Sequence, residues 1–166
     1  MKLIFDIGCN EGQNFDYYIK KGNVVIGVDG DQKLIKQNKK KFKNYISKKK
    51  LYLENCVVSK DKSKEKFYIH KYKNVLSQLK KPNKIDDYHT IKIESRICSN
   101  IIKKYLKKYN TKKIEFIKID VENSTADVLR DLFKNKIFPN YLSVEAQSSE
   151  ILYLILKSPY RSFKIL

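Results

Sequence analysis

Long hydrophobic runs are missing from this chain of 166 residues, and we expect no leader segment. No apolar run approaches the roughly 18 residues that a membrane-spanning helix needs. The opening "MKLIF" is too short for a secretory signal, and an aspartate follows it at once. We therefore expect a cytoplasmic protein with no membrane contact. The length is typical of one domain, and we expect that domain to span residues 1–166.

Cysteine is also scarce, and its spacing excludes two common uses. The three cysteines lie far apart, at Cys9, Cys56 and Cys98, with no C-x-x-C pair. An odd number at wide spacing argues against a disulfide framework and against a zinc site. The two histidines, His70 and His89, add no recognisable ligand spacing. We expect reduced thiols and no bound metal.

Arginine is rare in a strongly basic chain. Lysine and arginine total 36 against 18 acidic residues, which gives a formal charge of +18, yet the only arginines are Arg96, Arg130 and Arg161. Such a charge can bind nucleic acid through its phosphates. Proteins that read bases, however, rely on arginine for bidentate contacts. Abundant lysine, asparagine, isoleucine and tyrosine are typical of an AT-rich coding sequence, so a nucleic-acid partner is possible but not favoured.

Short β-branched runs alternate with amphipathic segments along the chain. This alternation predicts an α/β fold with a mostly parallel, doubly wound sheet. The polar–apolar alternation of residues 60–97 predicts an antiparallel addition to that sheet. We expect strands at 2–7, 23–29, 51–58, 114–121 (a central strand), 141–146 and, as a last short strand, 162–166. We expect helices at 13–21, around 101–109 and at 149–157. Two further helices are expected to begin after a cap at Asp31 and after a Ser124–Asp127 capping box.

The stretch "DIGCNEG" follows the first expected strand and carries two of the five glycines. Dinucleotide sites use G-x-G-x-x-G, but Asn10 stands where the second glycine would be. The spacing from Asp6 through Gly8 to Gly12 is instead the wider loop of S-adenosylmethionine sites. Asp29 ends the second strand, where a carboxylate can accept hydrogen bonds from ribose hydroxyls. The alternative is that Asp6 and Asp29 only cap loops.

Five stretches resemble the FkbM-type methyltransferases in their order and spacing. They are "FDIGCNEGQN" (5–14), "VVIGVDGD" (24–31), "LENCVVS" (53–59), "FIKIDVEN" (116–123) and "LSVEAQ" (142–147). The resemblance implies a Rossmann-like class I methyltransferase fold, S-adenosylmethionine as cofactor and a hydroxyl acceptor. It further implies that Asp6, Gly8 and Gly12 line the cofactor loop and that Asn10 and Glu11 face the methionine portion. By the same resemblance, Asp29 binds the ribose, and Asn55 and Cys56 lie near the adenine. Asp120 is expected beside the sulfonium and the acceptor.

A hydroxyl acceptor benefits from a carboxylate that takes its proton. Asp120 is the first candidate, Glu122 the second and Glu145 a weaker third, although each could instead pair with a lysine or cap a helix. The family continues this motif as E-G-A-E, whereas this chain has Glu122-Asn123-Ser124-Thr125 and lacks the second acid. The fold is also expected to be abbreviated at both termini, because the chain begins directly at the first strand.

Three functions remain open at this point. The first is an S-adenosylmethionine-dependent O-methyltransferase acting on a hydroxyl of a sugar, a glycan or a small molecule. The second is an RNA methyltransferase of cap or ribose hydroxyls, which the charge favours. Ribose enzymes need a lysine ahead of the first strand, however, and Lys2 lies too close to it. The third is a catalytically degenerate module that still binds the cofactor. The sequence predicts no particular oligomeric state.

Overall fold

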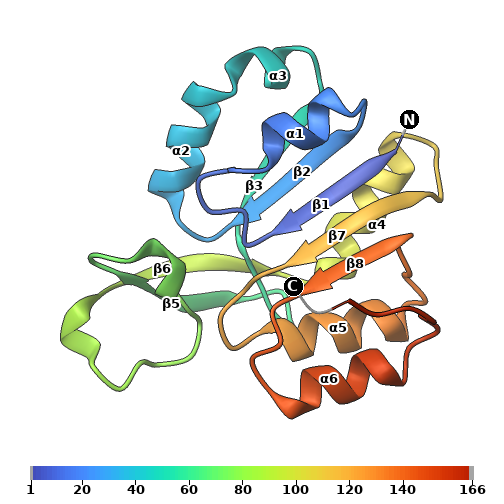
Figure 1. Cartoon of the computed structure of the whole chain (residues 1–166). Helices are drawn as coiled ribbons and strands as arrows, with labels where there is room; N and C mark the ends of the chain where they lie inside the picture. The colour runs from blue at the N-terminus through green and yellow to red at the C-terminus, as the bar shows by residue number, and fades with distance from the viewer. Residues whose placement is uncertain (1, 165–166) are drawn as a thin grey trace.

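The computed structural model describes residues 2–164, with every side chain among them except that of Asn74. A sheet of five strands runs through the middle of the protein in the order β3-β2-β1-β7-β8 (Figure 1). Every neighbouring pair is parallel, which confirms the α/β, Rossmann-like fold. The strand expected at 114–121 lies inside the sheet, with a strand paired on each side, as predicted. The bounds are β1 (Leu3–Ile7), β2 (Val24–Asp29), β3 (Leu51–Asn55), β7 (Ile114–Ile119) and β8 (Tyr141–Val144).

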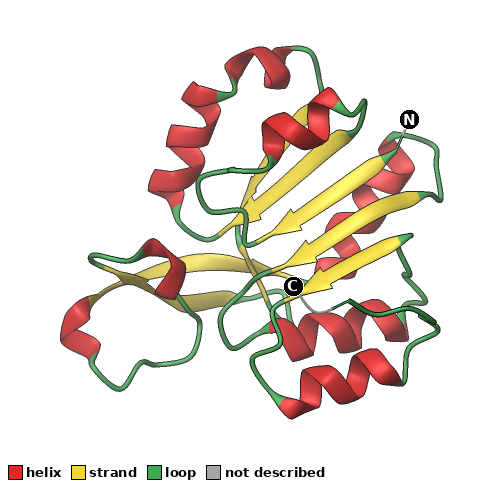
Figure 2. Ribbon diagram, viewed as in Figure 1, coloured by secondary structure: helices red, strands yellow, loops and turns green. Residues whose placement is uncertain are grey.

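Helices cover both faces of this sheet, as Figure 2 shows. Side chains of successive strand residues point to opposite faces. Ile4 accordingly packs with Phe15 of α1, while Phe5 packs with Ile102 of α4 and Leu129 of α5. The doubly wound arrangement is therefore confirmed. The helices are α1 (Phe15–Lys20), α2 (Gln32–Lys41) and α3 (Lys43–Ser47) on one face, and α4 (Cys98–Lys108), α5 (Thr125–Lys134) and α6 (Ser149–Leu156) on the other.

A second sheet corrects two expectations. Its order is β4-β6-β5, and β5 and β6 pair antiparallel as predicted, but they form their own sheet instead of extending the main one. The expected strand 51–58 divides at Cys56, because Val57 and Val58 leave the main sheet and pair with β6. The bounds are β4 (Val57–Val58), β5 (Lys64–His70) and β6 (Tyr88–Arg96), with short 3₁₀ helices η1 (Asn74–Leu76) and η2 (Ile85–Asp87) between β5 and β6.

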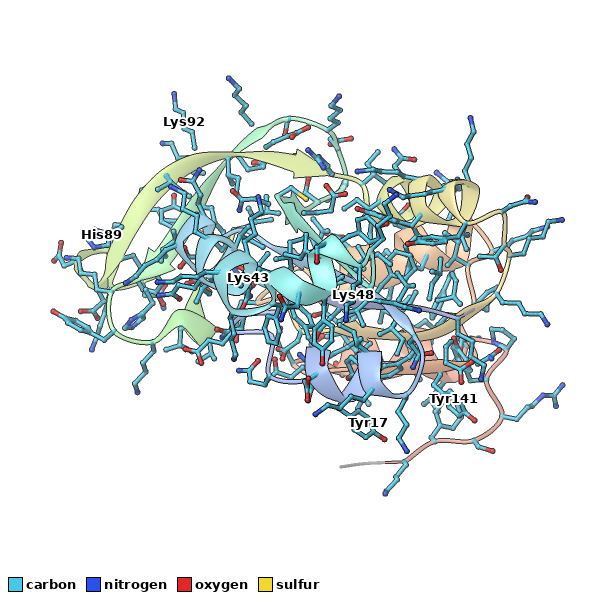
Figure 3. All side chains as sticks on the ribbon, turned by 90° about the horizontal axis from the view of Figure 1, so that it is seen from above. Tyr17, Lys43, Lys48, His89, Lys92 and Tyr141 are labelled. Atoms are coloured by element: carbon cyan, nitrogen blue, oxygen red, sulfur yellow. The ribbon has the colours of Figure 1, made fainter. Side chains whose placement is uncertain are left out.

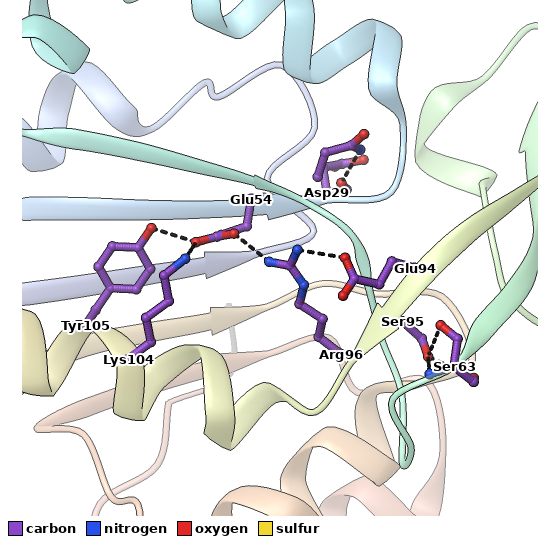
Figure 4. Close-up of polar contacts among 9 residues, drawn as sticks. Asp29, Glu54, Ser63, Glu94, Ser95, Arg96, Lys104 and Tyr105 are labelled. Carbon is purple, nitrogen blue, oxygen red and sulfur yellow. Dashed lines mark hydrogen bonds and ion pairs between the residues drawn. The ribbon is translucent and has the colours of Figure 1, made fainter.

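We call residues 64–96, which comprise β5, β6 and the loop between them, the arm. Figure 1 shows the arm extending past the carboxyl ends of β1, β2 and β3. An ionic cluster on Glu54 joins it to the main sheet (Figure 4). Arg96 donates to Glu54 Oε2 at 2.7 Å, and Tyr105 donates to Glu54 Oε1 at 2.7 Å. Burial opposes the charge of Glu54, but hydrogen bonds from Lys104 and Tyr105 outweigh it and lower the pKa of this carboxyl.

Two helix starts differ in how they are capped. Asp31 caps α2 as predicted, because its carboxylate accepts the backbone N–H groups of Lys33 and Leu34. The predicted capping box before α5 is wrong: the side chain of Ser124 makes no cap hydrogen bond, and Asp127 pairs with Arg130 instead.

The end of the described chain also differs from expectation. Residues 160–164 have no regular secondary structure, so the strand predicted at 162–166 is wrong as far as it is described; residues 165–166 lie outside the described range. Within residues 2–164, no helix has both the length and the apolar character needed to cross a bilayer.

Candidate active site

A cavity of about 300 Å³ opens at the carboxyl ends of the main-sheet strands, next to the arm. This edge is where ligands bind in open α/β sheets, since the loops after β1 and β2 and after β7 meet there. Of the residues singled out in the sequence, six line the cavity: Gly8, Asn10, Asp29, Cys56, Asp120 and Glu122. Five others lie outside its lining: Asp6, Glu11, Gly12, Asn55 and Glu145.

Gly8 brings the first loop against the end of β7. Its φ of +83° lies in the left-handed region, and a Cβ there would stand 1.9 Å from the carbonyl oxygen of Asp120. Its backbone N–H donates to the carbonyl of Val28 at 2.9 Å. Only glycine satisfies both the dihedral and the close approach. The loop is thereby fixed between β2 and β7.

Gly12 has a different role from the one that the spacing suggested. It also has a positive φ, +65°, but a Cβ there would lie 2.5 Å from the ring of Phe15. The glycine thus makes room for an aromatic side chain of the core, not for a cavity wall. Glu11 is exposed beside it. Any contact of these two residues with a cofactor stays a prediction.

Asn10 and Asp29 are held against each other inside the cavity. Asn10 has a φ of +46°, and its backbone N–H donates to Asp29 Oδ2 at 2.8 Å. The other oxygen of Asp29 accepts the backbone N–H of Asp31 at 2.8 Å. The side-chain oxygen of Asn10 is buried and has no hydrogen-bond partner. A buried acceptor without a donor is costly, so this position suits a ligand that carries an N–H or O–H group.

Asp6 lies beneath the cavity, close to a lysine that the sequence interpretation did not select. Lys118 Nζ is 2.6 Å from Asp120 Oδ2 and 3.8 Å from Asp6 Oδ1. Asp6 Oδ1 has no hydrogen-bond partner, and burial raises the pKa of Asp6 to about 6. The same effect raises the pKa of Asp29 to about 6. Lys118 could have been noticed as the one cation within the strand 114–119, two residues before Asp120.

Asn55 and Cys56 mark the point where the chain leaves the main sheet. The side chain of Asn55 donates to the carbonyls of Asp29 and Gly30, at 3.0 and 3.3 Å. It therefore shapes the end of β2 instead of facing the cavity. Cys56 does line the cavity, and burial raises the pKa of its thiol to about 12, so it stays protonated at neutral pH.

Two glutamates share one amide group at the far side of the cavity. Gln147 Nε2 donates to Glu122 Oε2 at 3.1 Å and to Glu145 Oε2 at 2.8 Å. Burial is the main cause that raises the pKa of Glu122, followed by the charges of Glu145 and Asp120. Glu145 itself is exposed. Gln147 had no distinguishing pattern in the sequence, because it comes near Glu122 only when β7 and β8 pair.

The donor and acceptor content of the cavity limits its ligand. Among the described lining residues the one cationic side chain is Lys118, and Asp120 already occupies it. A phosphate would therefore meet carboxylates without a free cation. A ligand with an ammonium group, hydroxyl groups or positive charge would satisfy the free oxygen of Asn10 and the remaining lone pairs of Asp29.

Comparison with known proteins gives one match. The family model described as the methyltransferase FkbM domain matches residues 6–156. That range begins within β1 and ends with α6, so it contains both sheets and every cavity-lining residue. No curated protein and no solved structure matches the chain.

Proposed function

The chain belongs to the FkbM methyltransferase family, and from this premise we propose that it uses S-adenosylmethionine to methylate a hydroxyl of a sugar, a glycan or a small molecule. One observation carries the proposal. The same cavity holds a buried acceptor without a donor, at Asn10, and a carboxylate without a cation, at Glu122. The first suits the cofactor and the second suits a hydroxyl that must lose its proton.

The residues of the β1 and β2 loops fit the proposed cofactor. Asn10 Oδ1 would accept a hydrogen bond from the amino group, and Asp29 would accept from the ribose hydroxyls through its remaining lone pairs. Cys56, Val57 and Phe67 give the cavity an apolar wall suited to the adenine. When bound, the cofactor supplies a methyl group on a sulfonium sulfur, already activated for displacement.

Glu122 is better suited than Asp120 to take the acceptor proton, which reverses the order expected from the sequence. Asp120 already has a cationic partner, because its Oδ2 lies 2.6 Å from Lys118 Nζ. Glu122 has no ion pair among the described residues, and its raised pKa increases its basicity. We assign Asp120 to holding Lys118 in place and Glu122 to proton removal.

The charge near the acceptor side favours an uncharged acceptor. Asp120, Glu122 and Glu145 bring three carboxylates to this region, and Lys118 offsets one of them. An anionic acceptor would be repelled. A sugar offers hydroxyl donors to these oxygens and carries no charge.

An RNA acceptor remains the second candidate because of one surface feature. The helices α2 and α3 and the turn after them contain no acidic residue from 32 to 50, and Figure 3 shows Lys43 and Lys48 on this surface. Such a surface can attract a polyanion. None of its lysines lines the cavity, however, so the basic surface and the cavity are formed by different residues. The lysines are 33, 36, 39, 40, 41, 43, 48, 49 and 50.

Calorimetric titration with S-adenosylhomocysteine tests the cofactor. We expect binding by the parent protein and affinity at least about tenfold weaker for Asp29→Ala, since a charge-assisted hydrogen bond is lost. Asp61→Ala, which changes an exposed aspartate, is the matched control. Absence of heat with the parent would refute the cofactor. Equal affinity of Asp29→Ala and parent would refute the ribose assignment. RNA methylation, together with RNA binding whose affinity falls steeply with salt concentration, would make the second candidate the preferred one.

A further inference from the structure

One wall of the cavity comes from the arm. Val75, Ser77, Gln78 and Leu79 of the loop between β5 and β6 line the same cavity as Glu122. We call residues 74–79 the wall segment. The wall segment belongs to neither sheet, so it is held in place by turns and by the hydrogen bonds of individual residues. How it is held therefore decides how open the acceptor side of the cavity is.

Gln78 connects the wall segment to both neighbouring structures. Its backbone exchanges two hydrogen bonds with Tyr68 of β5, each 2.9 Å long, and it forms an isolated parallel bridge with Glu122. Its side-chain oxygen accepts from Asn123 Nδ2 at 2.6 Å. Gln78 thus joins β5 to the loop between β7 and α5, which carries the proposed base.

Asn123 is the partner that makes this connection specific to this chain. Its φ of +61° lies in the left-handed region, where glycine is most at ease and asparagine is among the best-tolerated alternatives. Its backbone N–H donates to Gln147 Oε1 at 3.3 Å. A glycine could keep this backbone, but it could not reach Gln78. The asparagine therefore adds one contact that glycine cannot make.

The first part of the arm loop has its own anchor. His70 Nδ1 accepts the backbone N–H groups of Tyr72 and Lys73, both at 3.1 Å, and the backbone N–H of His70 donates to Ser77 Oγ at 3.2 Å. Val75, between the two anchors, is 63% exposed. The wall segment is thus tied to β5 through His70 and Tyr68, and the hydrogen bond between Gln78 and Asn123 is the side-chain contact that ties it to the loop of Glu122.

We propose that the hydrogen bond between Gln78 and Asn123 is a latch that closes the wall segment over the acceptor side of the cavity. The latch joins an exposed pair of neutral amides, so it can open and re-form while an uncharged, hydroxyl-bearing acceptor enters. The nature of that acceptor rests on the proposed function, whereas the latch itself belongs to the protein alone. Gln78 contributes to acceptor selection because it lines the cavity directly.

Alkylation of Cys56 measures how often the cavity opens. Its thiol lines the cavity but is 1% exposed, and Cys9 and Cys98 are equally buried in the core away from the cavity. Iodoacetamide labelling followed by peptide mass spectrometry reads the three thiols separately. A local opening raises labelling at Cys56 alone, whereas general loosening raises it at all three.

We expect Gln78→Ala and Asn123→Gly each to increase the labelling rate of Cys56 by about fivefold, the ratio expected for loss of one neutral hydrogen bond. The double variant should label no faster than either single variant, because both remove the same bond. Gln37→Ala, which changes an exposed glutamine on α2, is the control and should not alter the rate.

Three results would overturn the latch: an unchanged rate at Cys56 in both single variants, multiplicative rates in the double variant, or parallel increases at Cys9 and Cys98. Asn123→Gly keeps the backbone conformation and so guards against misfolding as an explanation. Titration of the same parent sample with S-adenosylhomocysteine separates the two proposals. Heat without the expected labelling refutes the latch alone, and the expected labelling without heat refutes the cofactor alone.

Discussion

Asp6 shows how a single buried carboxylate can lower the stability of the folded protein. Its carboxylate is buried, one oxygen has no hydrogen-bond donor, and its pKa is raised to about 6. The folded protein therefore binds a proton at Asp6 more tightly than the unfolded chain, whose aspartate has an ordinary pKa near 4. Between about pH 4 and pH 6 this residue must lower the free energy of unfolding as the pH rises.

We predict that Asp6→Asn removes most of this loss. The free energy of unfolding at pH 7 should rise by about 1–2 kcal/mol, because no buried charge remains, and it should depend less on pH between 4 and 6. Asp29 has the same sign of shift and will leave a residual slope. Urea unfolding at pH 4.5 and pH 7 measures both quantities.

Asp61→Asn, at an exposed position, should leave the profile unchanged. A variant at Asp6 with the parent's slope would mean that Lys118, 3.8 Å away, already compensates the charge. Lower stability at pH 7 would have the same meaning.

At the scale of elements, the close approach of the β1 loop to the end of β7 is the strictest packing constraint on the site. We predict that Gly8→Ala lowers the free energy of unfolding by about 2–4 kcal/mol. Part of the cost is the left-handed backbone, about 1–2 kcal/mol, and the rest is displacement of the Asp120 carbonyl 1.9 Å from the new Cβ.

Gly22→Ala separates these two contributions. Gly22 has nearly the same φ, +84°, but a Cβ there would meet no atom within 4 Å. It should therefore show the backbone cost alone, in the same denaturant titration. Equal losses for the two variants would show that the loop yields and that β7 does not confine it.

The elements themselves were largely predictable from local patterns. Each main-sheet strand and five of the α-helices follow from apolar periodicity and from caps such as Asp31, whereas the short helix α3 was not predicted. The division of strand 51–58 was not predictable, because Val57 and Val58 are as apolar as the residues before them, and their partner β6 lies far along the chain. Likewise Ser124 has the residue type of a cap and stands at the cap position of α5, yet its side chain makes no cap hydrogen bond.

The site residues were predictable where a local sequence pattern marks them and were not predictable where segments far apart in the sequence meet. Asn10 lies in the glycine loop after β1, whose spacing indicated it, and Asp29 was indicated by its place as the acid that ends β2. The approach of Lys118 to Asp6 and the contacts of Gln78 with Asn123 and of Gln147 with Glu122 arise only when distant segments meet. No local pattern contains that information.

Across the whole molecule, the cluster on Glu54 is the main polar connection between the two sheets. We predict that Glu54→Gln lowers the free energy of unfolding by about 2–3 kcal/mol, because Arg96 and Lys104 lose a shared carboxylate in a largely buried place. Glu115→Gln, which weakens the surface pair with Lys2, should cost less than about 1 kcal/mol.

Thermal unfolding of the two variants beside the parent measures the difference. The Glu54 variant should also lose protection from hydrogen exchange in β5 and β6 first, because the arm depends on this connection more than the main sheet does. Similar, small losses for both variants would mean that the ionic cluster contributes little to joining the two sheets.

The strand order also sets the sequence of events during synthesis. β1 pairs on one side with β2, which follows it closely, and on the other with β7, which begins only at Ile114. While the chain leaves the ribosome, β1 therefore waits with one edge unpaired until β7 has been made, more than 100 residues later, and contacts of such separation form slowly. The cavity needs both halves, so a nascent chain can neither bind a ligand there nor gain stability from one before β7 has inserted. A destabilising change in β7 should thus expose β1 to aggregation during synthesis, even where the finished protein tolerates it.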